Sequence, residues 1–300
     1  MLDDEIEAVI VTTFHPTHAD LCIKALEAGK NVLTEKPIAT SPADAARIKE
    51  AVDKYGKILM ALPYDNYPQM EEAKRLLRIG AIGTVNSADA IFAHQGPIHA
   101  PWFFDKTKAE WGVLADLGIY PISILTYLFG PAESVLGRVS TVFPERTSLS
   151  GERFQVTVED NAAAIIIWSN GIMGTIRSNW CTSVDKNDSV WEIKIYGSKG
   201  IIFINMASKE NSLVVYSPYA PIDGAEKAPY NELAECYRPK LADSDAHLDI
   251  LRSFANAVQT DTPFPSDGVS IVRQQHVIEI IDKIYRSSET GAVQILQTRF

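Results

Sequence analysis

Short apolar runs alternate with helical segments over the first 83 residues, and this alternation constrains the fold more than any other feature of the chain. The runs show no period-two pattern, as expected for strands that are buried on both faces. Strands that alternate with helices predict βαβ units on a parallel sheet. The predicted strands are Ala8–Thr13, Asn31–Thr34 and Lys57–Leu62, and the predicted helices begin near Thr17, Ser41 and Tyr67.

Particular residues mark the expected helix ends. Thr17 is expected to cap the first helix, with Asp20 three residues on, and Gly29 is expected to close it. Ser41 followed by Pro42 is typical of a helix start, because a serine side chain caps the helix and a proline fits its first position.

After residue 83 strand-like stretches follow one another, and Trp191, Ile193 and Ile195 alternate with polar neighbours. This period of two indicates an antiparallel sheet with one buried face. The fold class is therefore α/β plus α+β: a truncated Rossmann-like parallel sheet in residues 1–83, then residues 84–300 with a large, mostly antiparallel open sheet. The expected strands are Val85–Ala93, Phe154–Trp168, Ile172–Trp180, Trp191–Tyr196 and Ile201–Asn205, and the expected helices are Pro121–Phe129, Ala246–Gln259 and Val269–Ser287.

Composition excludes several classes of protein. The formal charge of −10 disfavours nucleic acid as a partner, since binding phosphates needs a basic stripe. The longest apolar run, Ala162–Trp168, is far shorter than the roughly 20 residues of a membrane span, and the N-terminus lacks the pattern of a signal peptide. The three cysteines form no CxxC pair and are expected to be buried thiols, which favours a cytoplasmic protein.

Polar side chains follow the first two strands directly, where ligands of open α/β sheets bind. His15 and His18 come just after the first strand, and Lys36 comes after the second. Two histidines three residues apart could share a metal ion, but no third ligand has a suitable spacing, so no metal site is predicted. The glycines form no GxGxxG, GxSxG or GxxxxGK[ST] motif. The other four histidines are expected in exposed loops, at the core edge or at the surface: His94, His99, His247 and His276.

Four blocks of sequence occur in an order and spacing that resemble the glucose–fructose oxidoreductase / inositol dehydrogenase / MocA (Gfo/Idh/MocA) family. They are TTFHPTHADLCIKALEAGKNVLTEKPIAT (12–40), WGVLADLGIYPISILTYLFG (111–130), VEDNAAAIIIWSNGIMGTIRSNW (158–180) and YGSKGIIFI (196–204). The resemblance implies a Rossmann domain that holds NAD or NADP and an α/β domain that supplies the substrate pocket. Tyr120 stands where many members have histidine, as in the branch of glucose–fructose oxidoreductase and dihydrodiol dehydrogenase.

The resemblance also implies roles for individual residues. Tyr120 would be the general acid/base, Lys36 its catalytic partner and Asp116 the residue that orients them. A phenol with a pKa near 10 is a poor base at neutral pH, and a neighbouring lysine cation favours the phenolate. The Lys36–Pro37 bond is a candidate cis peptide. The expected cofactor-binding residues are Thr13, His15, His18, Glu35, Lys36 and Pro37, and the expected substrate residues are Trp102 and Ser123.

The chain departs from the family pattern at several places. Ser123 replaces an aspartate or asparagine, Glu110-Trp111-Gly112 replaces a glycine-rich run, and Pro63-Tyr64-Asp65 lacks the usual arginines. The family's first strand, its GxGxxG turn and its ribose-binding acid have no counterpart, which corresponds to about 60 residues of expected fold. The strand Ala8–Thr13 would then have an unpaired apolar edge, which another chain or segment is expected to cover.

Three functional hypotheses remain open. The first is an oxidoreductase that transfers a hydride between NAD(P) and a carbinol of a sugar, polyol or related small molecule. The second is a redox-neutral lyase, epimerase or hydrolase on the same scaffold, and the third is a non-catalytic partner subunit. We expect a homo-oligomer that forms through the open sheet or through the Ala8–Thr13 edge.

Overall fold

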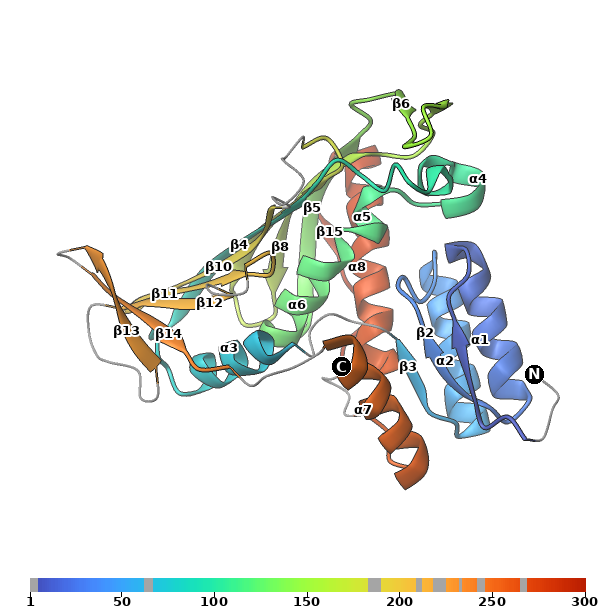
Figure 1. Ribbon diagram of the computed structural model, residues 1–300, viewed down its shortest axis with the longest axis horizontal. Coiled ribbons are helices and arrows are strands. Elements are labelled where there is room, and N and C mark those ends of the chain that lie inside the picture. Colours follow the sequence, from blue (N-terminus) through green and yellow to red (C-terminus); the bar gives the residue numbers. More distant parts are fainter. Residues whose placement is uncertain are drawn as a thin grey trace.

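The structure is a computed structural model that describes residues 5–61, 67–182, 190–208, 212–217, 225–231, 234–241, 246–264 and 269–300. The triplet Pro63-Tyr64-Asp65 lies outside the described residues, as does the side chain of His247. Figure 1 shows two sheets with helix α8 (Ile271–Thr290) running between them.

The N-terminal sheet is parallel, as predicted, with the order β1-β2-β3 among the described strands. Alternate residues of its strands point to opposite faces, so each face has its own core. On one face Val32 and Leu59 pack against helices α1 and α2. On the other face Leu33 and Met60 pack against α7. These elements are β1 (Ala8–Val11), α1 (His18–Glu27), β2 (Asn31–Thr34), α2 (Pro42–Tyr55), β3 (Leu59–Ala61) and α7 (Ala246–Thr260).

The predicted cap of α2 is confirmed, whereas the predicted cap of α1 is wrong. Ser41 Oγ accepts a hydrogen bond from the Asp44 backbone N–H at 3.0 Å. The Thr17 side chain makes no capping bond, because a 3₁₀ turn, η1 (His15–Thr17), precedes the helix. Its hydroxyl instead donates to the Phe14 carbonyl at 2.7 Å.

The second sheet has ten strands in the order β13-β14-β12-β11-β10-β4-β9-β8-β5-β15. Among the described pairs of this sheet, only β4 and β9 run parallel, so the prediction of a mostly antiparallel sheet is confirmed. The strands are β4 (Val85–Ala93), β5 (Ala132–Ser140), β8 (Asn161–Trp168), β9 (Met173–Asn179), β10 (Val190–Gly197), β11 (Gly200–Asn205), β12 (Leu213–Ser217), β13 (Ala225–Asn231), β14 (Ala234–Pro239) and β15 (Gln294–Ile295).

The predicted single strand Phe154–Trp168 is wrong, because the chain forms two strands there. Its first part is β7 (Arg153–Gln155), which pairs with β6 (Glu145–Thr147) in a separate ribbon. The second part is β8 in the large sheet. Between them the Asp160 carboxylate accepts the backbone N–H groups of Val142 and Phe143, which turns the chain from the ribbon into the sheet.

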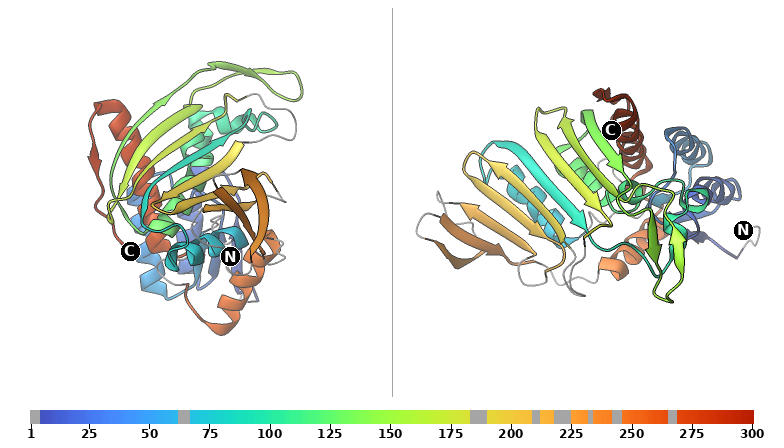
Figure 2. Two further views of the ribbon diagram at one scale, coloured as in Figure 1. Left: turned by 90° about the vertical axis from the view of Figure 1, so that its left-hand side faces the viewer. Right: turned by 90° about the horizontal axis from the view of Figure 1, so that it is seen from above.

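Helices cover one face of the large sheet, and the opposite face carries none of the described helices (Figure 2). The covering helices are α3 (Pro68–Arg78), α6 (Ile119–Phe129) and α8. Along α8, Ile278 packs into the N-terminal core, whereas Ile280, Ile281 and Ile284 pack into the core of the large sheet. The end of the chain therefore contributes to both cores, and a domain boundary at residue 83 stays a prediction.

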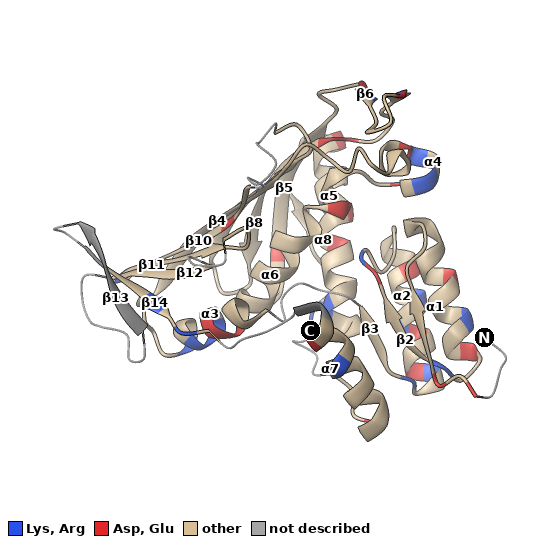
Figure 3. Ribbon diagram, in the orientation of Figure 1, with Lys and Arg blue, Asp and Glu red and all other residues tan. Residues whose placement is uncertain are grey.

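Charged residues of both signs are mixed along α1, α2 and α3 (Figure 3). No helix in the described part of the chain is both long and apolar enough to cross a bilayer. The three cysteines are free, with Cys22 and Cys236 buried and Cys181 only partly buried, contrary to the expectation for Cys181.

His276 is fully buried, so its expected place at the core edge or surface is wrong. Its Nε2 accepts the Ala132 backbone N–H at 2.8 Å, and its Nδ1 lies 2.8 Å from Thr298 Oγ1. Because Nε2 accepts, we assign the proton to Nδ1. The imidazole thus joins β5 to the C-terminal segment.

Candidate active site

Lys36 and Asp116 are 80 residues apart in the sequence and form an ion pair in the structure. Lys36 follows β2, and the Lys36–Pro37 peptide is cis, as the motif suggested. Asp116 ends the one-turn helix α5 (Val113–Asp116). Lys36 Nζ donates to the Asp116 carboxylate and, at 2.8 Å, to the Asp116 carbonyl oxygen. The two side chains remain only 14% and 11% exposed, so water screens the pair weakly.

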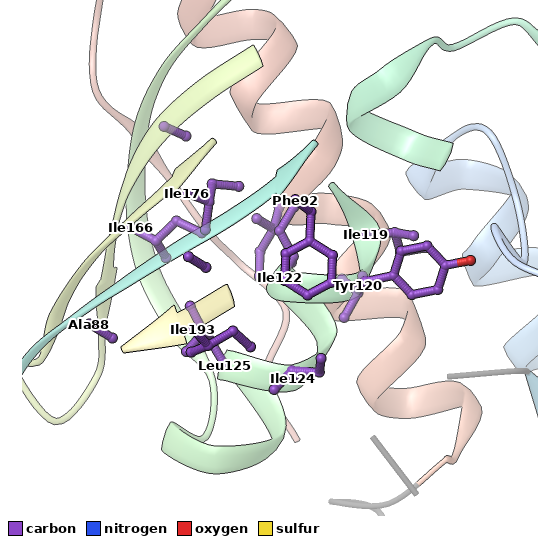
Figure 4. Packing of buried hydrophobic residues seen from close by; sticks show 14 of the residues in the cluster. Ala88, Phe92, Ile119, Tyr120, Ile122, Ile124, Leu125, Ile166, Ile176 and Ile193 are labelled. Carbon is purple, nitrogen blue, oxygen red and sulfur yellow. The ribbon is translucent and has the colours of Figure 1, made fainter. Parts of the chain in front are cut away.

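Tyr120 lies beside this ion pair. It is the second residue of α6, and its ring stacks beside two aromatic rings, with centroids 5.6 Å from Trp191 and 6.3 Å from Phe92, which themselves stack 5.5 Å apart. Lys36 Nζ lies 5.0 Å from the centre of the Tyr120 ring. Figure 4 shows the phenol oxygen pointing away from the apolar cluster and toward the N-terminal elements. The stacked rings therefore fix the phenol at the junction between the two sheets.

The two strand-end histidines are buried rather than exposed to solvent. The ring nitrogens of His18 lie 2.8 Å from the Pro37 carbonyl oxygen and 2.9 Å from the Thr13 carbonyl oxygen, so His18 ties the ends of β1 and β2 together. The His15 ring packs edge-on against Trp102, with centroids 5.1 Å apart.

Burial lowers the pKa of His15 to about 4, and the nearby charges of Asp116 and Lys36 act on it in opposite directions. The buried His15 Nδ1 has no hydrogen-bond partner among the described residues. At neutral pH this histidine is uncharged and holds an unused polar atom at the carboxyl edge of the parallel sheet.

The remaining predicted site residues are placed as follows. Glu35 accepts the Lys36 backbone N–H at 3.2 Å, and Thr13 Oγ1 lies 2.6 Å from Thr17 Oγ1. Trp102 stacks on Phe103 with centroids 3.8 Å apart, in the 3₁₀ turn η2 (Pro101–Phe104). Ser123 is buried, and its hydroxyl accepts from Arg273 of α8 at 3.2 Å. The substrate roles of Trp102 and Ser123 stay predictions.

His94 was expected as an exposed loop residue, and this is wrong. It is half-buried just after β4, and Gly96 N–H donates to its Nδ1 at 2.8 Å. Burial lowers the pKa of His94, and Asp116 and Lys36 lie close enough to influence it. The signal that could have found it is its position immediately after a strand end. Within the described ranges, no group of three or more His, Cys, Asp or Glu side chains is placed to hold a metal ion.

Two family models match the chain. Residues 1–62 match the oxidoreductase family with an NAD-binding Rossmann fold, and residues 70–203 match the GFO/IDH/MocA C-terminal domain. The chain belongs to the GFO/IDH/MocA oxidoreductase family. The resemblance found in the four sequence blocks is thereby confirmed at the level of the family.

Curated relatives of this GFO/IDH/MocA chain include two dehydrogenases. Levoglucosan dehydrogenase of Pseudarthrobacter phenanthrenivorans is 28% identical over 233 residues, which cover 72% of this chain and 59% of that protein. Trans-1,2-dihydrobenzene-1,2-diol dehydrogenase of Mus musculus is 28% identical over 214 residues, covering 71% and 59%. The aligned part of the chain thus spans about three fifths of the length of these relatives.

Solved structures share the fold over nearly the whole chain. Levoglucosan dehydrogenase in complex with NADH and levoglucosan superposes with a TM-score of 0.82 at 23% identity, covering 99% of this chain and 82% of that one. The aldose-aldose oxidoreductase of Caulobacter crescentus, complexed with glycerol, gives a TM-score of 0.77 at 22% identity, covering 98% and 80%.

Proposed function

We propose that this chain oxidises a carbinol of a sugar or cyclic diol with NAD or NADP, using Tyr120 as general acid/base and Lys36 as its partner. The observation that carries the proposal is the contact among three side chains: Lys36 Nζ is paired with the Asp116 carboxylate and lies 5.0 Å from the centre of the Tyr120 ring. Relatives named for levoglucosan and dihydrodiol support the substrate class.

The strand-end residues fit the nicotinamide half of a dinucleotide. His15 keeps a buried Nδ1 without a hydrogen-bond partner among the described residues, and an unused buried polar atom indicates a group that completes it. His15, Thr13 and Lys36 all lie at the carboxyl ends of β1 and β2, where ligands of parallel sheets bind. When bound there, NAD or NADP would accept the hydride from the carbinol carbon.

Each protein group has a defined task in this proposal. Tyr120 takes the proton of the substrate hydroxyl, because a phenolate beside a lysine cation is a competent base. Lys36 stabilises that phenolate and donates a hydrogen bond to the substrate oxygen. Asp116 holds Lys36 in place, and the stacked rings of Phe92 and Trp191 hold the phenol.

The first experiment measures cofactor binding by fluorescence titration of NADH and NADPH, and then turnover of levoglucosan, a dihydrodiol and a panel of aldoses. We expect binding of at least one cofactor and hydride transfer with at least one carbinol. The absence of binding at millimolar concentrations of either cofactor contradicts the proposal. Nicotinamide-independent turnover that requires Tyr120 supports a redox-neutral enzyme instead.

The Tyr120→Phe variant tests the role of the phenol. Loss of a general acid/base typically lowers the rate by about 10²–10⁴-fold, so we expect kcat to fall in that range while the cofactor dissociation constant is unchanged. Tyr55→Phe is the matched control, since Tyr55 Oη contacts Glu27 on the surface of the N-terminal helices. Equal kcat values for Tyr120→Phe and the wild type refute the assignment.

The bare face of the large sheet supports a homo-oligomer. Leu136, Ile165 and Met173 expose 40%, 41% and 49% of their surface there. The edge strand β1 also exposes 55% of Ile10. Apolar surface of this kind typically marks a protein interface. Light scattering after size exclusion measures the mass, and Ile165→Glu is expected to dissociate the sheet-mediated oligomer.

A further inference from the structure

Glu159 lies outside the site described above, but it contacts the segment that carries Asp116. Its carboxylate accepts the Gly112 backbone N–H at 3.0 and 3.1 Å and the Leu114 N–H at 3.1 Å. Its own carbonyl oxygen accepts the Val113 N–H at 3.0 Å. One residue therefore satisfies the amides at the beginning of α5 with both its side chain and its backbone.

The carboxylate is held from the opposite side by α8. Tyr285 Oη donates to Glu159 Oε1 at 2.5 Å, and the Tyr285 ring stacks on Trp111 with centroids 5.5 Å apart. Burial raises the pKa of Glu159, while the bonds from Tyr285, Leu114 and Gly112 act in the opposite direction. The side chain is thus fixed between a long helix and the start of α5.

The approach of Glu159 to α5 leaves no spare room. A Cβ atom on Gly112 would lie 2.1 Å from the Glu159 carbonyl oxygen and 2.8 Å from its Cδ. No real side chain fits at such distances, so this glycine is required by close approach rather than by its φ of −99°. The position of α5 relative to Glu159 is therefore tightly determined.

Helix α5 has four residues and cannot hold its own geometry, because a single helical turn gains little from cooperativity. Its last residue is Asp116, whose carboxylate and carbonyl oxygen both accept from Lys36 Nζ. A shift at the start of this turn is transmitted directly to the oxygens that hold Lys36. Displacing a reacting group by about 1 Å can lower a rate by about 10²-fold.

We propose that Glu159 is a positioning residue: by binding the backbone N–H groups at the start of α5, it fixes the position of Asp116 and, through Asp116, that of Lys36. The reaction it serves is the one proposed above, and the effect on Lys36 can be measured without that reaction. We call Glu159 a positioning residue and not a catalytic one, because none of the hydrogen bonds described for it involves Tyr120 or Lys36.

The test compares Glu159→Gln with the wild type. Glutamine keeps the shape, and its amide oxygen can still accept from Leu114 and Tyr285, but its amide nitrogen then places an N–H donor about 3.1 Å from the Gly112 donor. We expect kcat to fall at least about 10-fold with the cofactor dissociation constant unchanged. Independently of turnover, we expect acetic anhydride to acetylate Lys36 at least three-fold faster, relative to Lys49 of the surface pair Lys49–Asp53. Peptide mass mapping gives both rates.

A second variant and a control variant accompany Glu159→Gln. Tyr285→Phe removes one bond to Glu159 and keeps the stacked ring, so we expect the same changes at smaller size. Glu145→Gln alters an exposed glutamate of the β6–β7 ribbon and is expected to match the wild type. If Glu159→Gln does not fold, Tyr285→Phe decides the question.

A folded variant with a lowered melting temperature but unchanged Lys36 acetylation overturns the positioning role. If the wild type shows no nicotinamide-dependent turnover, the proposed function fails, and the acetylation rates still decide the role of Glu159.

Discussion

Glu110 adopts a backbone conformation that side chains other than glycine rarely take. Its φ is 65° and its ψ is −50°, and the Trp111 N–H donates back to the Ala109 carbonyl at 2.8 Å, which closes a γ-turn. Such strain costs about 1–3 kcal/mol. The Thr40 hydroxyl, just beyond the cis-proline, donates to the Glu110 carboxylate. This bond joins the turn to the loop that carries Lys36 and opposes the strain.

The strain at Glu110 predicts an unusual order of stability. Glu110→Gly loses the Thr40 bond but relieves the turn, whereas Glu110→Ala loses the bond and keeps the strain. We expect the alanine variant to be less stable than the glycine variant by about 1 kcal/mol. Urea denaturation measures the free energies of unfolding.

Glu50, on the exposed side of α2, is the matched control for Glu110. There alanine should be more stable than glycine by about 1 kcal/mol, because glycine is unfavourable inside a helix. The same order of alanine and glycine at both positions contradicts a strained turn at Glu110.

At the scale of single elements, the N-termini of α1 and α2 show that a serine or threonine in a capping sequence does not always cap the helix. Both helices follow a threonine or serine with an acidic residue three positions on. Only Ser41 has the extended φ and ψ of −149° and 152° that aim its side chain at the helix amides. Thr17 has helical angles of −90° and −13°, because η1 continues almost directly into α1.

This difference predicts unequal effects of two similar substitutions. Ser41→Ala is expected to cost about 1 kcal/mol, since it removes the hydrogen bond to the Asp44 N–H. Thr17→Ala is expected to cost less, because the Thr17 hydroxyl is exposed and water replaces its bonds. Thermal denaturation of the two variants measures the difference, and an equal loss at both positions contradicts it.

At the scale of the whole molecule, buried neutral histidines connect distant parts of the chain. His15 lies at the site between the sheets, and His276 lies where α8 meets β5 and the C-terminal segment. Burial is the largest cause that lowers each pKa from 6.5 to about 4. In the unfolded chain both imidazoles take up a proton below pH 6.5, whereas in the folded protein they do so only near pH 4.

The free energy of unfolding is therefore expected to be insensitive to these groups above pH 6.5 and to fall between pH 6.5 and 4. Each histidine contributes a slope of about 1.4 kcal/mol per pH unit in that window. His276→Gln keeps an acceptor for the Ala132 N–H and should remove one such slope, while His99→Gln, in an exposed loop, should not. Urea titrations at pH 7.5, 5.5 and 4.5 test this. An unchanged slope in His276→Gln refutes it.

Much of the fold could be predicted from local patterns. The parallel strand Asn31–Thr34, the cap at Ser41 and the period-two strand around Trp191 depend on neighbours within a few residues, and the structure has them all. The strand predicted at Ala8–Thr13 is also present, but it ends at Val11. The break in Phe154–Trp168 could not be predicted, because the apolar character continues through it. The turn there depends on Asp160 binding the amides of Val142 and Phe143.

The sequence alone determined the alternation of strands and helices over the first 83 residues, the family and the chemical types at the strand ends, because these follow from short-range periodicity and motif. Only the tertiary structure decided that Lys36 pairs with Asp116 across 80 residues and that α8 packs into two cores. It also decided that His94 lies near this ion pair and that Glu159 binds the start of α5. Periodicity reports which face of an element is buried and carries no information on which distant face it meets. Packing between elements decides that partner, and with it the charge, burial and contacts of every side chain in the site.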